Sequence, residues 1–324
     1  MYQAPRPGEG ARIPRVSVVV PLYQKAATVE RTLASITAQT LGDFEAIVVD
    51  DGSTDGCGAA VAELGDSRFR LVRQSNSGPG AARNRGIDEA RGAYVAFLDA
   101  DDYWDAGYLA RMVARLDANH DAVAAACSYR TARRSLVRRW RRAGLTDGSV
   151  RVVAGTSPSD VVTLVAFLSP CTTVVRRDAV RSAGGFYEHG CCYGEDSFLA
   201  LKLVCSGAIE VVLADLVTVD DGASALNVRR RTRPLEPLFA GAAELRAHAP
   251  VALRALVDDV LALRAGKAAC IMAYWGRNRE AAELIADFTR RRHLRYGWVL
   301  LGRLSASPAG ALAAAAVRQF SMAR

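Results

Sequence analysis

Acidic side chains follow two apolar runs of this sequence, at the points where each run ends. Asp99 and Asp101 form a D-x-D pair after AYVAFL. Asp50, Asp51 and Asp55 surround a Gly-Ser turn after FEAIVV. Mg²⁺ and Mn²⁺ prefer carboxylate oxygens, usually one or two together with substrate phosphates, so the pattern favours a cation and a phosphate-bearing ligand. One Asp-Gly-Ser cluster alone is equally typical of an ordinary turn.

A second acidic pair, Glu195 and Asp196, begins the segment GEDSFLALKL, which we expect to be a helix. The N-terminus of a helix carries partial positive charge, which favours a carboxylate there. The pair on its own would therefore be explained by the helix dipole. A catalytic interpretation depends on the other acidic clusters lying nearby.

The elements that must position these acids can be predicted from the apolar pattern. Short apolar runs indicate buried strands, and apolar residues at helical spacing indicate helices between them. This alternation predicts an α/β fold with a mostly parallel sheet flanked by helices, in which ligands bind beyond the carboxyl ends of the strands. The predicted strands are 16–20, 44–50, 69–72, 93–99, 122–128, 172–175 and 209–213, and the predicted helices include 29–36, 79–90 and 105–118.

Composition and charge bound the function classes. The chain has 324 residues, half of them hydrophobic, and a net charge of +8, which excludes a mainly disordered or collagen-like protein. The basic excess favours an anionic partner. The longest uncharged runs are shorter than the roughly 20 apolar residues that a span requires. Seven cysteines without a CxxC pair, and no apolar N-terminal segment, favour a cytoplasmic protein.

We expect three parts along the chain. Residues 1–14 are a Pro- and Gly-containing flexible leader, 15–230 form the α/β domain, and 231–324 form a helical C-terminal region. Within the α/β domain, about 129–155 is expected to be an Arg-rich insertion, since 129–142 holds seven arginines and no acid.

Three stretches resemble glycosyltransferase family 2, whose members have the Rossmann-like GT-A fold. They are 16–56 (VSVVVPLYQ to DDGSTDG), 76–104 (NSGPGAARNRG to FLDADDYW) and 184–207 (GGFYEHGCCYGEDSF to CSG). They occur in family order, and the three together are far more specific than any one. Gln24 departs from the family, which usually has Asn there.

The resemblance implies a role for individual residues. Pro21, Tyr23 and Asp51 would contact the base of a nucleotide sugar, and Asn76 and Arg83 would contact the rest of the nucleotide. Asp101 would be the main ligand of Mn²⁺ or Mg²⁺, with Asp99 beside it and nearer the ribose. Asp196 would be the catalytic base, paired with Glu195. Some GT-A enzymes add a later metal ligand, and here Asp220 or Asp221 could supply it, followed by the basic run 229–233.

The resemblance further implies an inverting, metal-dependent transfer from a UDP- or dTDP-type donor to a hydroxyl of a glycan or lipid-linked acceptor, in polysaccharide or cell-envelope synthesis. Non-processive transfer is expected, because 133–140 does not match the processive-synthase signature. One alternative is a prenyl-phosphate sugar transferase, which would not need a base. Another is a basic nucleic-acid-binding protein, but no recognition motif accompanies the arginines, so we expect no nucleic-acid partner.

Two further contacts are open at this stage. Leu136, Val137 and Trp140 interrupt the arginines of 129–142, so this segment could hold the protein at an anionic inner membrane surface. A solvated insertion is an equally good explanation. The apolar residues of the C-terminal helices could pack on the α/β domain or form a homo-oligomer.

Overall fold

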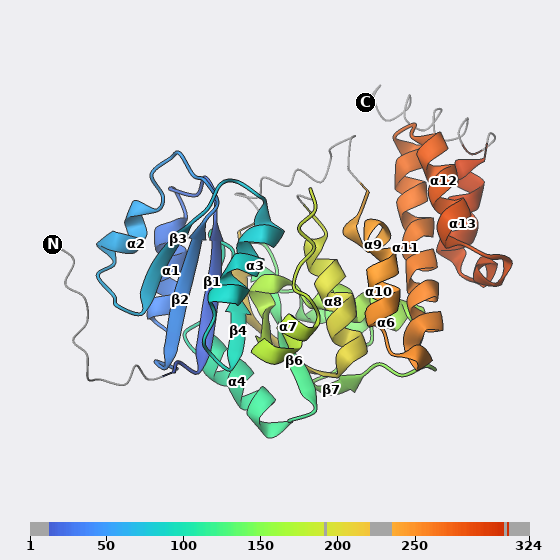
Figure 1. Cartoon of the computed structure of the whole chain (residues 1–324). Coiled ribbons are helices and arrows are strands. Elements are labelled where there is room, and N and C mark those ends of the chain that lie inside the picture. The colour runs from blue at the N-terminus through green and yellow to red at the C-terminus, as the bar shows by residue number, and fades with distance from the viewer. Residues whose placement is uncertain (1–12, 191–192, 221–234, 308–309, 311–324) are drawn as a thin grey trace.

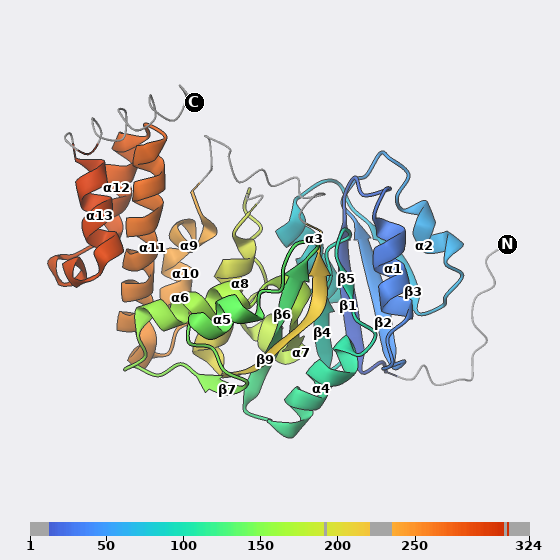
Figure 2. The same ribbon diagram turned by 180° about the vertical axis from the view of Figure 1, so that it is seen from behind.

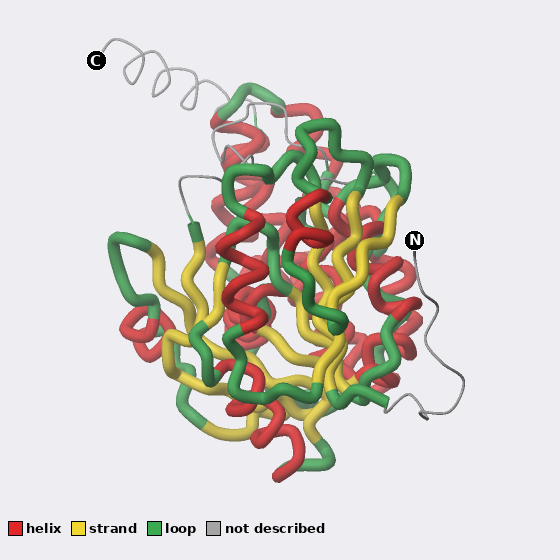
Figure 3. The backbone as a smooth tube through the Cα atoms, turned by 90° about the vertical axis from the view of Figure 1, so that its left-hand side faces the viewer, coloured by secondary structure: helices red, strands yellow, loops and turns green. Residues whose placement is uncertain are grey.

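The computed structural model describes residues 13–190, 193–220, 235–307 and 310. One mixed sheet lies at the centre, with helices on both sides (Figures 1 and 3). Its order is β3-β2-β1-β4-β8-β6-β9-β5, with β7 paired to β9. The strands are β1 (Val16–Leu22), β2 (Phe44–Asp50), β3 (Phe69–Arg73), β4 (Tyr94–Phe97), β5 (Tyr103–Trp104), β6 (Ala122–Thr131), β7 (Gly148–Arg151), β8 (Thr173–Arg176) and β9 (Ala208–Val219).

Helices were predicted at 29–36, 79–90 and 105–118, from Glu195 and in the C-terminal region. The first four helices of the structure are α1 (Val29–Thr37), α2 (Ala59–Glu63), α3 (Pro79–Glu89) and α4 (Tyr108–Ala118). The middle four are α5 (Val137–Arg142), α6 (Pro158–Phe167), α7 (Arg177–Ser182) and α8 (Glu195–Ser206). Of these helices, α2, α6 and α7 were not predicted. The C-terminal helices are α9 (Pro237–Ala240), α10 (Ala242–His248), α11 (Arg254–Tyr274), α12 (Asn278–Phe288) and α13 (Gly297–Ala306), with the short 3₁₀ turns η1 (Pro170–Thr172), η2 (Val251–Leu253) and η3 (Arg291–Arg295).

The sheet separates two hydrophobic cores, because successive side chains of a strand point to opposite faces. Val18 and Val20 of β1 belong to the core shared with α1 and α4. Val19, between them, belongs to the core shared with α3 and α8. Because β1 and β2 are buried on both faces, their sequences are mostly apolar along the whole strand, as expected for central parallel strands.

The predicted α/β fold class is confirmed, with a difference in the second half of the sheet. Strands β3, β2, β1 and β4 are parallel neighbours, which matches the prediction. β8 then runs antiparallel to both β4 and β6. Apolar runs do not reveal strand direction, so the antiparallel pairs could not be foreseen. β5 and β7 were not predicted, since one has two residues and the other is largely polar.

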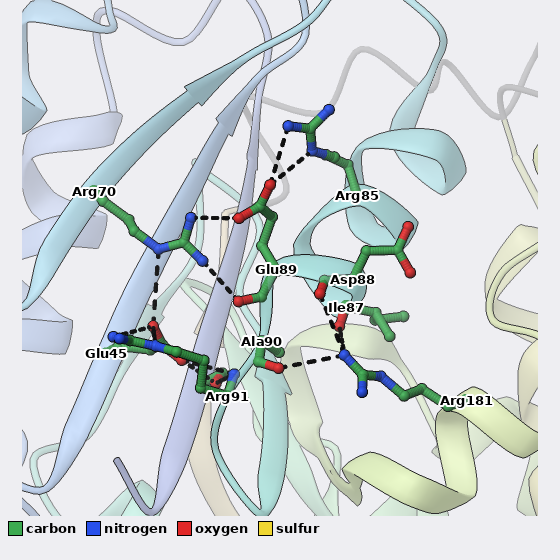
Figure 4. Close-up of polar contacts among 10 residues, drawn as sticks. Glu45, Arg70, Arg85, Ile87, Asp88, Glu89, Ala90, Arg91 and Arg181 are labelled. Carbon is green, nitrogen blue, oxygen red and sulfur yellow. Dashed lines mark hydrogen bonds and ion pairs between the residues drawn. The ribbon is translucent and has the colours of Figure 1, made fainter. Parts of the chain in front are cut away.

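The C-terminal end of α3 is held by arginines from neighbouring elements (Figure 4). Arg181 of α7 donates to the carbonyl oxygens of Ile87 and Ala90, at 3.1 and 3.4 Å, where a helix lacks internal partners. Arg70 of β3 pairs with Glu89 at 2.8 Å. These contacts fix α3 between the sheet and α7, and α3 carries Arg83.

The segment 129–155 is not a separate insertion at its start, because β6 continues to Thr131. Leu136 and Trp140 are buried in the protein's own core, and the Trp140 ring packs edge-on against Phe167 at 5.3 Å. The predicted apolar edge for membrane contact is therefore wrong for these two residues. The arginines of α5 stay exposed.

The C-terminal helices pack on the α/β part of the chain. Leu245 of α10 and Leu261 of α11 belong to the same core as Val19 and α8. Lys202 of α8 is fully buried; its ammonium donates to the Ala183 carbonyl at 2.7 Å and pairs with Glu244 of α10. Among the described residues, no helix is both long and apolar enough to cross a membrane.

Candidate active site

Asp51 follows the carboxyl end of β2 and accepts hydrogen bonds from the loop that leads into α3. One of its oxygens accepts from Gln74 Nε2 and the Ser77 amide, both at 2.8 Å, and the other from the Gly78 amide at 2.9 Å. The same loop carries the exposed Asn76. In the structure, the predicted base-binding residue Asp51 thus also holds the backbone around Asn76 in place.

Pro21 lies at the carboxyl end of β1, and Tyr23 follows the strand in the loop before α1. Pro21 is partly buried, whereas Tyr23 is exposed. Gln24 next to them has φ +52°, a left-handed conformation that Asn adopts more easily than most residues. Its amide donates to Thr54 Oγ1 at 3.0 Å, so the loop is tied to the Gly-Ser turn after β2.

Arg83 of α3 joins the two acidic pairs. Its Nη2 donates to Asp99 Oδ1 and its Nη1 to Glu195 Oε1, both at 2.7 Å. Arg83 and Glu195 are both buried. Burial disfavours the charged guanidinium, but the two carboxylates outweigh it and raise the pKa of Arg83. Arg83, predicted to contact the nucleotide, therefore bridges the end of β4 and the start of α8.

Asp101, the second acid of the D-x-D pair, lies beside cations from the loop after β1 and from α1. Asp101 pairs with Lys25 at 2.5 Å. Arg31 of α1 donates to the Asp101 carbonyl at 2.9 Å and pairs with Asp220 at 2.7 Å. Asp220, a candidate extra ligand, thus lies beside the D-x-D pair. Asp221 and the basic run 229–233 lie outside the described residues.

Asp102 is the most deeply buried acid of this group. Its pKa is raised to about 8, first by burial and then by the negative charges of Asp99 and Asp101. Its Oδ1 accepts from the Asp220 amide at 3.0 Å, which ties the end of β9 to the D-x-D loop. Asp102 therefore supports the loop.

Asp196 lies at the first turn of α8 and lines a small cavity between β8 and α8. The cavity volume is about 20 Å³, room for one water molecule, and apart from Asp196 and Thr173 its walls are apolar. Burial raises the pKa of Asp196, and the negative charge of Glu195 raises it further. A carboxylate whose pKa is raised toward neutral is a stronger proton acceptor than an ordinary aspartate.

The chemistry of the acids after β4 fits a divalent cation. Mn²⁺ and Mg²⁺ sites commonly combine one or two carboxylates with substrate phosphates, and Asp99 and Asp101 supply such a pair. Within the described ranges, no group of three or more His, Cys, Asp or Glu side chains is arranged to hold a metal. The residues present thus fit a cation whose remaining ligands would be oxygens of a bound phosphate.

Two residues that sequence analysis missed belong to this site. Lys25 and Arg31 pair with Asp101 and Asp220. The signal was available, since Lys25 follows the carboxyl end of β1 next to an expected acidic site. It was weak, because a single lysine in a polar loop is usually solvated.

Comparisons with known proteins show the family of the chain and its fold. The sequence model of the family described as Glycosyl transferase family 2 matches residues 17–183. Over 109 residues the chain is 38% identical to an uncharacterized glycosyltransferase, EpsJ, of Bacillus subtilis. This match covers 33% of this chain and 32% of that protein. The chain is 44% identical over 108 residues to the succinoglycan biosynthesis protein ExoO of Rhizobium meliloti, 33% of this chain and 31% of the relative. It thus spans about a third of the length of these relatives.

Solved structures share the fold over most of the chain. TarS of S. aureus in complex with UDP superimposes with a TM-score of 0.62 at 19% identity, covering 90% of this chain and 88% of that one. The mannosyltransferase PcManGT of Pyrobaculum calidifontis, in complex with GDP-Man and Mn²⁺, gives a TM-score of 0.52 at 20% identity, covering 96% and 88%. At these identities the likeness concerns the fold.

Proposed function

The chain belongs to glycosyl transferase family 2, and from this premise we propose that it transfers a sugar from a nucleoside-diphosphate sugar to an acceptor hydroxyl. One observation carries the proposal: Arg83 binds Asp99 and Glu195 together, so the two acidic pairs meet at one edge of the sheet. The solved relatives with UDP and GDP-Man support a nucleotide-sugar donor. We favour a UDP- or dTDP-type donor.

In this proposal Asp196 removes the proton of the acceptor hydroxyl. The oxygen of the acceptor hydroxyl then attacks the anomeric carbon of the donor sugar, and the bond from that carbon to the donor diphosphate breaks. The proton stays on a carboxylate oxygen of Asp196. A single displacement from the opposite face inverts the configuration. The raised pKa of Asp196 supports this role, because the carboxylate can both accept the proton and release it afterwards.

Asp101, with Asp99 beside it, would hold Mn²⁺ or Mg²⁺ in this proposal. The bound cation would supply Lewis-acid stabilisation of the departing diphosphate. The PcManGT complex with Mn²⁺ supports such use of a metal. Lys25 adds a fixed positive charge beside the same carboxylate.

The acceptor is proposed to be a hydroxyl of a glycan or lipid-linked glycan in polysaccharide or envelope synthesis. The match to a succinoglycan biosynthesis protein supports this class. We further propose non-processive transfer in the cytoplasm. A prenyl-phosphate acceptor is disfavoured, since an ionised phosphate needs no base and Asp196 would have no role.

A screen of sugar nucleotides with Mn²⁺ and with Mg²⁺ tests the proposal. Slow metal-dependent hydrolysis of one donor is expected without an acceptor, because water can replace the hydroxyl. Asp196→Asn should lose this hydrolysis. Absence of hydrolysis and of UDP, dTDP and GDP binding would reject the function, whereas a salt-sensitive complex with generic DNA would favour the nucleic-acid alternative.

A further inference from the structure

The outward side of α13 carries four large apolar side chains in contact with water. Trp298, Leu300, Leu301 and Leu304 are 47, 46, 50 and 56% exposed. At 100° per residue they fall on one side of the helix. These four residues are called the α13 face below. Contiguous exposed apolar surface of this kind marks a contact site, whereas single exposed hydrophobic residues do not.

The packing of α13 on α11 fixes the direction of this face. A Cβ on Gly302 would lie 2.6 Å from the Gly266 carbonyl oxygen, and one on Gly266 would lie 2.4 Å from the Trp298 carbonyl oxygen. The two backbones therefore touch at this point. Val299 is fully buried on the same side. The α13 face is thus turned away from α11, at the end of the molecule remote from α2 (Figures 1 and 2).

Positive charge borders the face at its N-terminal end. The 3₁₀ turn η3 carries the exposed Arg291, Arg292 and Arg295, and Arg290 precedes it. One carboxylate, Asp259, pairs with Arg292 and Arg295 at 3.6 and 3.3 Å, so the four arginines keep a net positive charge. The surface therefore combines an apolar face with adjacent arginines.

We propose that α13 and η3 bind the surface of an anionic membrane, with the α13 face in the lipid and the arginines at the headgroups. Helices that lie in the interface have this composition, with Trp and Leu on one side and Arg beside them. α13 has 10 residues, too short to span the roughly 30 Å core, so it would lie along the surface. A second copy would bring a like-charged turn to the interface, whereas anionic lipid supplies the opposite charge.

This surface differs from the one expected at 129–142, where Leu136 and Trp140 are buried. Vesicle binding is measured without sugar transfer, so the inference does not rest on the proposed function. If both hold, the membrane would bring the protein to lipid-linked acceptors.

The test measures binding of the full chain to phosphatidylglycerol–phosphatidylcholine vesicles and to phosphatidylcholine vesicles. Wild type should bind the anionic vesicles. The double variant Leu301→Ser with Leu304→Ser should weaken vesicle binding at least about tenfold. Burial of one leucine side chain in the lipid would by itself account for most of that change in affinity, or all of it. The matched control, Val153→Ser with Val251→Ser, removes two exposed apolar side chains elsewhere and should bind like wild type.

Arginine variants separate this surface from the exposed arginines of α5. Arg291→Gln with Arg292→Gln should weaken binding by about fivefold per arginine. Arg141→Gln with Arg142→Gln removes the same charge and should have little effect. Equal losses in both pairs would overturn the proposal, because binding would then follow net charge.

Quenching of tryptophan fluorescence by brominated lipid tests insertion directly. Quenching should occur in wild type and fall strongly in Trp298→Phe, because Trp104 and Trp140 are buried and Trp275 is partly buried. Absence of vesicle binding by wild type, or unchanged quenching in Trp298→Phe, would overturn the proposal. So would a concentration-dependent dimer that Leu301→Ser with Leu304→Ser dissociates while vesicle binding is unaffected, since a second copy would then cover the face.

Discussion

The acid pair after β4 and the acid pair that begins α8 share one arginine but have different surroundings. Asp101 lies beside the ammonium of Lys25, and Arg31 binds its backbone. Asp196 lines a mostly apolar cavity next to another carboxylate, and its pKa is raised. Cations lie next to the first pair, whereas burial raises the pKa of Asp196 in the second pair and favours proton transfer there. In the proposed mechanism, this difference supports cation binding by the first pair and base chemistry by the second.

The largest effect on activity is expected from Asp196→Asn. The amide keeps the shape but cannot accept the acceptor's proton, so kcat should fall by about 10²–10⁴-fold. Nucleotide affinity should stay close to that of wild type. UDP release with a competent acceptor, alongside titration of UDP, checks both. Retention of more than about a tenth of the turnover would shift the base role to Glu195.

Arg83→Met tests whether one guanidinium holds both pairs. It leaves the buried Glu195 without its cation, and breaking such a pair costs about 3–5 kcal/mol of unfolding free energy. Arg85→Met on the same helix removes only the exposed pair with Glu89, worth about 0.3–0.5 kcal/mol. Urea denaturation compares the two variants. Similar costs would show that the buried pairs contribute no more than a surface pair.

Asp101→Ala should remove the metal-dependent part of donor affinity. Loss of the main carboxylate should weaken UDP binding in Mn²⁺ at least about tenfold, equivalent to about 1.4 kcal/mol. Affinity without Mn²⁺ should change little. Calorimetric titration with and without Mn²⁺ measures this, with Asp105→Ala, a nearby acid paired with Arg130, as the control. Unchanged metal-dependent affinity would remove Asp101 from the cation site.

The smallest expected effect concerns the pH dependence of Glu195→Gln. Asp196 must be ionised to act, so activity should fall as the pH drops through its raised pKa. Burial is the largest cause of the raised pKa of Asp196, and the negative charge of Glu195 is the second. The neutral amide in Glu195→Gln removes this second cause. The acid limb of the kcat profile should therefore move to lower pH in Glu195→Gln. A limb that stays in place or moves upward would contradict the coupling of these two carboxylates.

The sequence predicted the parallel half of the sheet closely, because β1, β2 and β4 are almost wholly buried apolar runs and acids follow β2 and β4. The bounds of β1, β2 and β3 differ from the prediction by two residues at most. The later strands were found but not their direction or full length. β9 extends to Val219, six residues beyond the predicted end, since its second half alternates polar and apolar residues.

The candidate site could be predicted by residue but not by contact. Spacing and family resemblance identified Asp99 and Glu195, yet no pattern indicates that both bind Arg83, 16 and 112 residues away along the chain. The raised pKa of Asp196 could not be predicted from the sequence either, because it depends on side chains from β4, β8 and α8 that line one cavity.

The buried Lys202 has a consequence for how this protein can be divided or recombined. The family match ends at residue 183, before α8, yet α8 carries Asp196 and, at Lys202, an ammonium whose counter-ion comes from α10. A fragment ending near 230 would leave that ammonium without its carboxylate, in the helix that positions the base. Exchanging the C-terminal helices between relatives would therefore require either a substitute acid for Glu244 or a neutral residue at 202. Because this ion pair joins α8 to α10, we expect α8 and the C-terminal helices to be exchanged together.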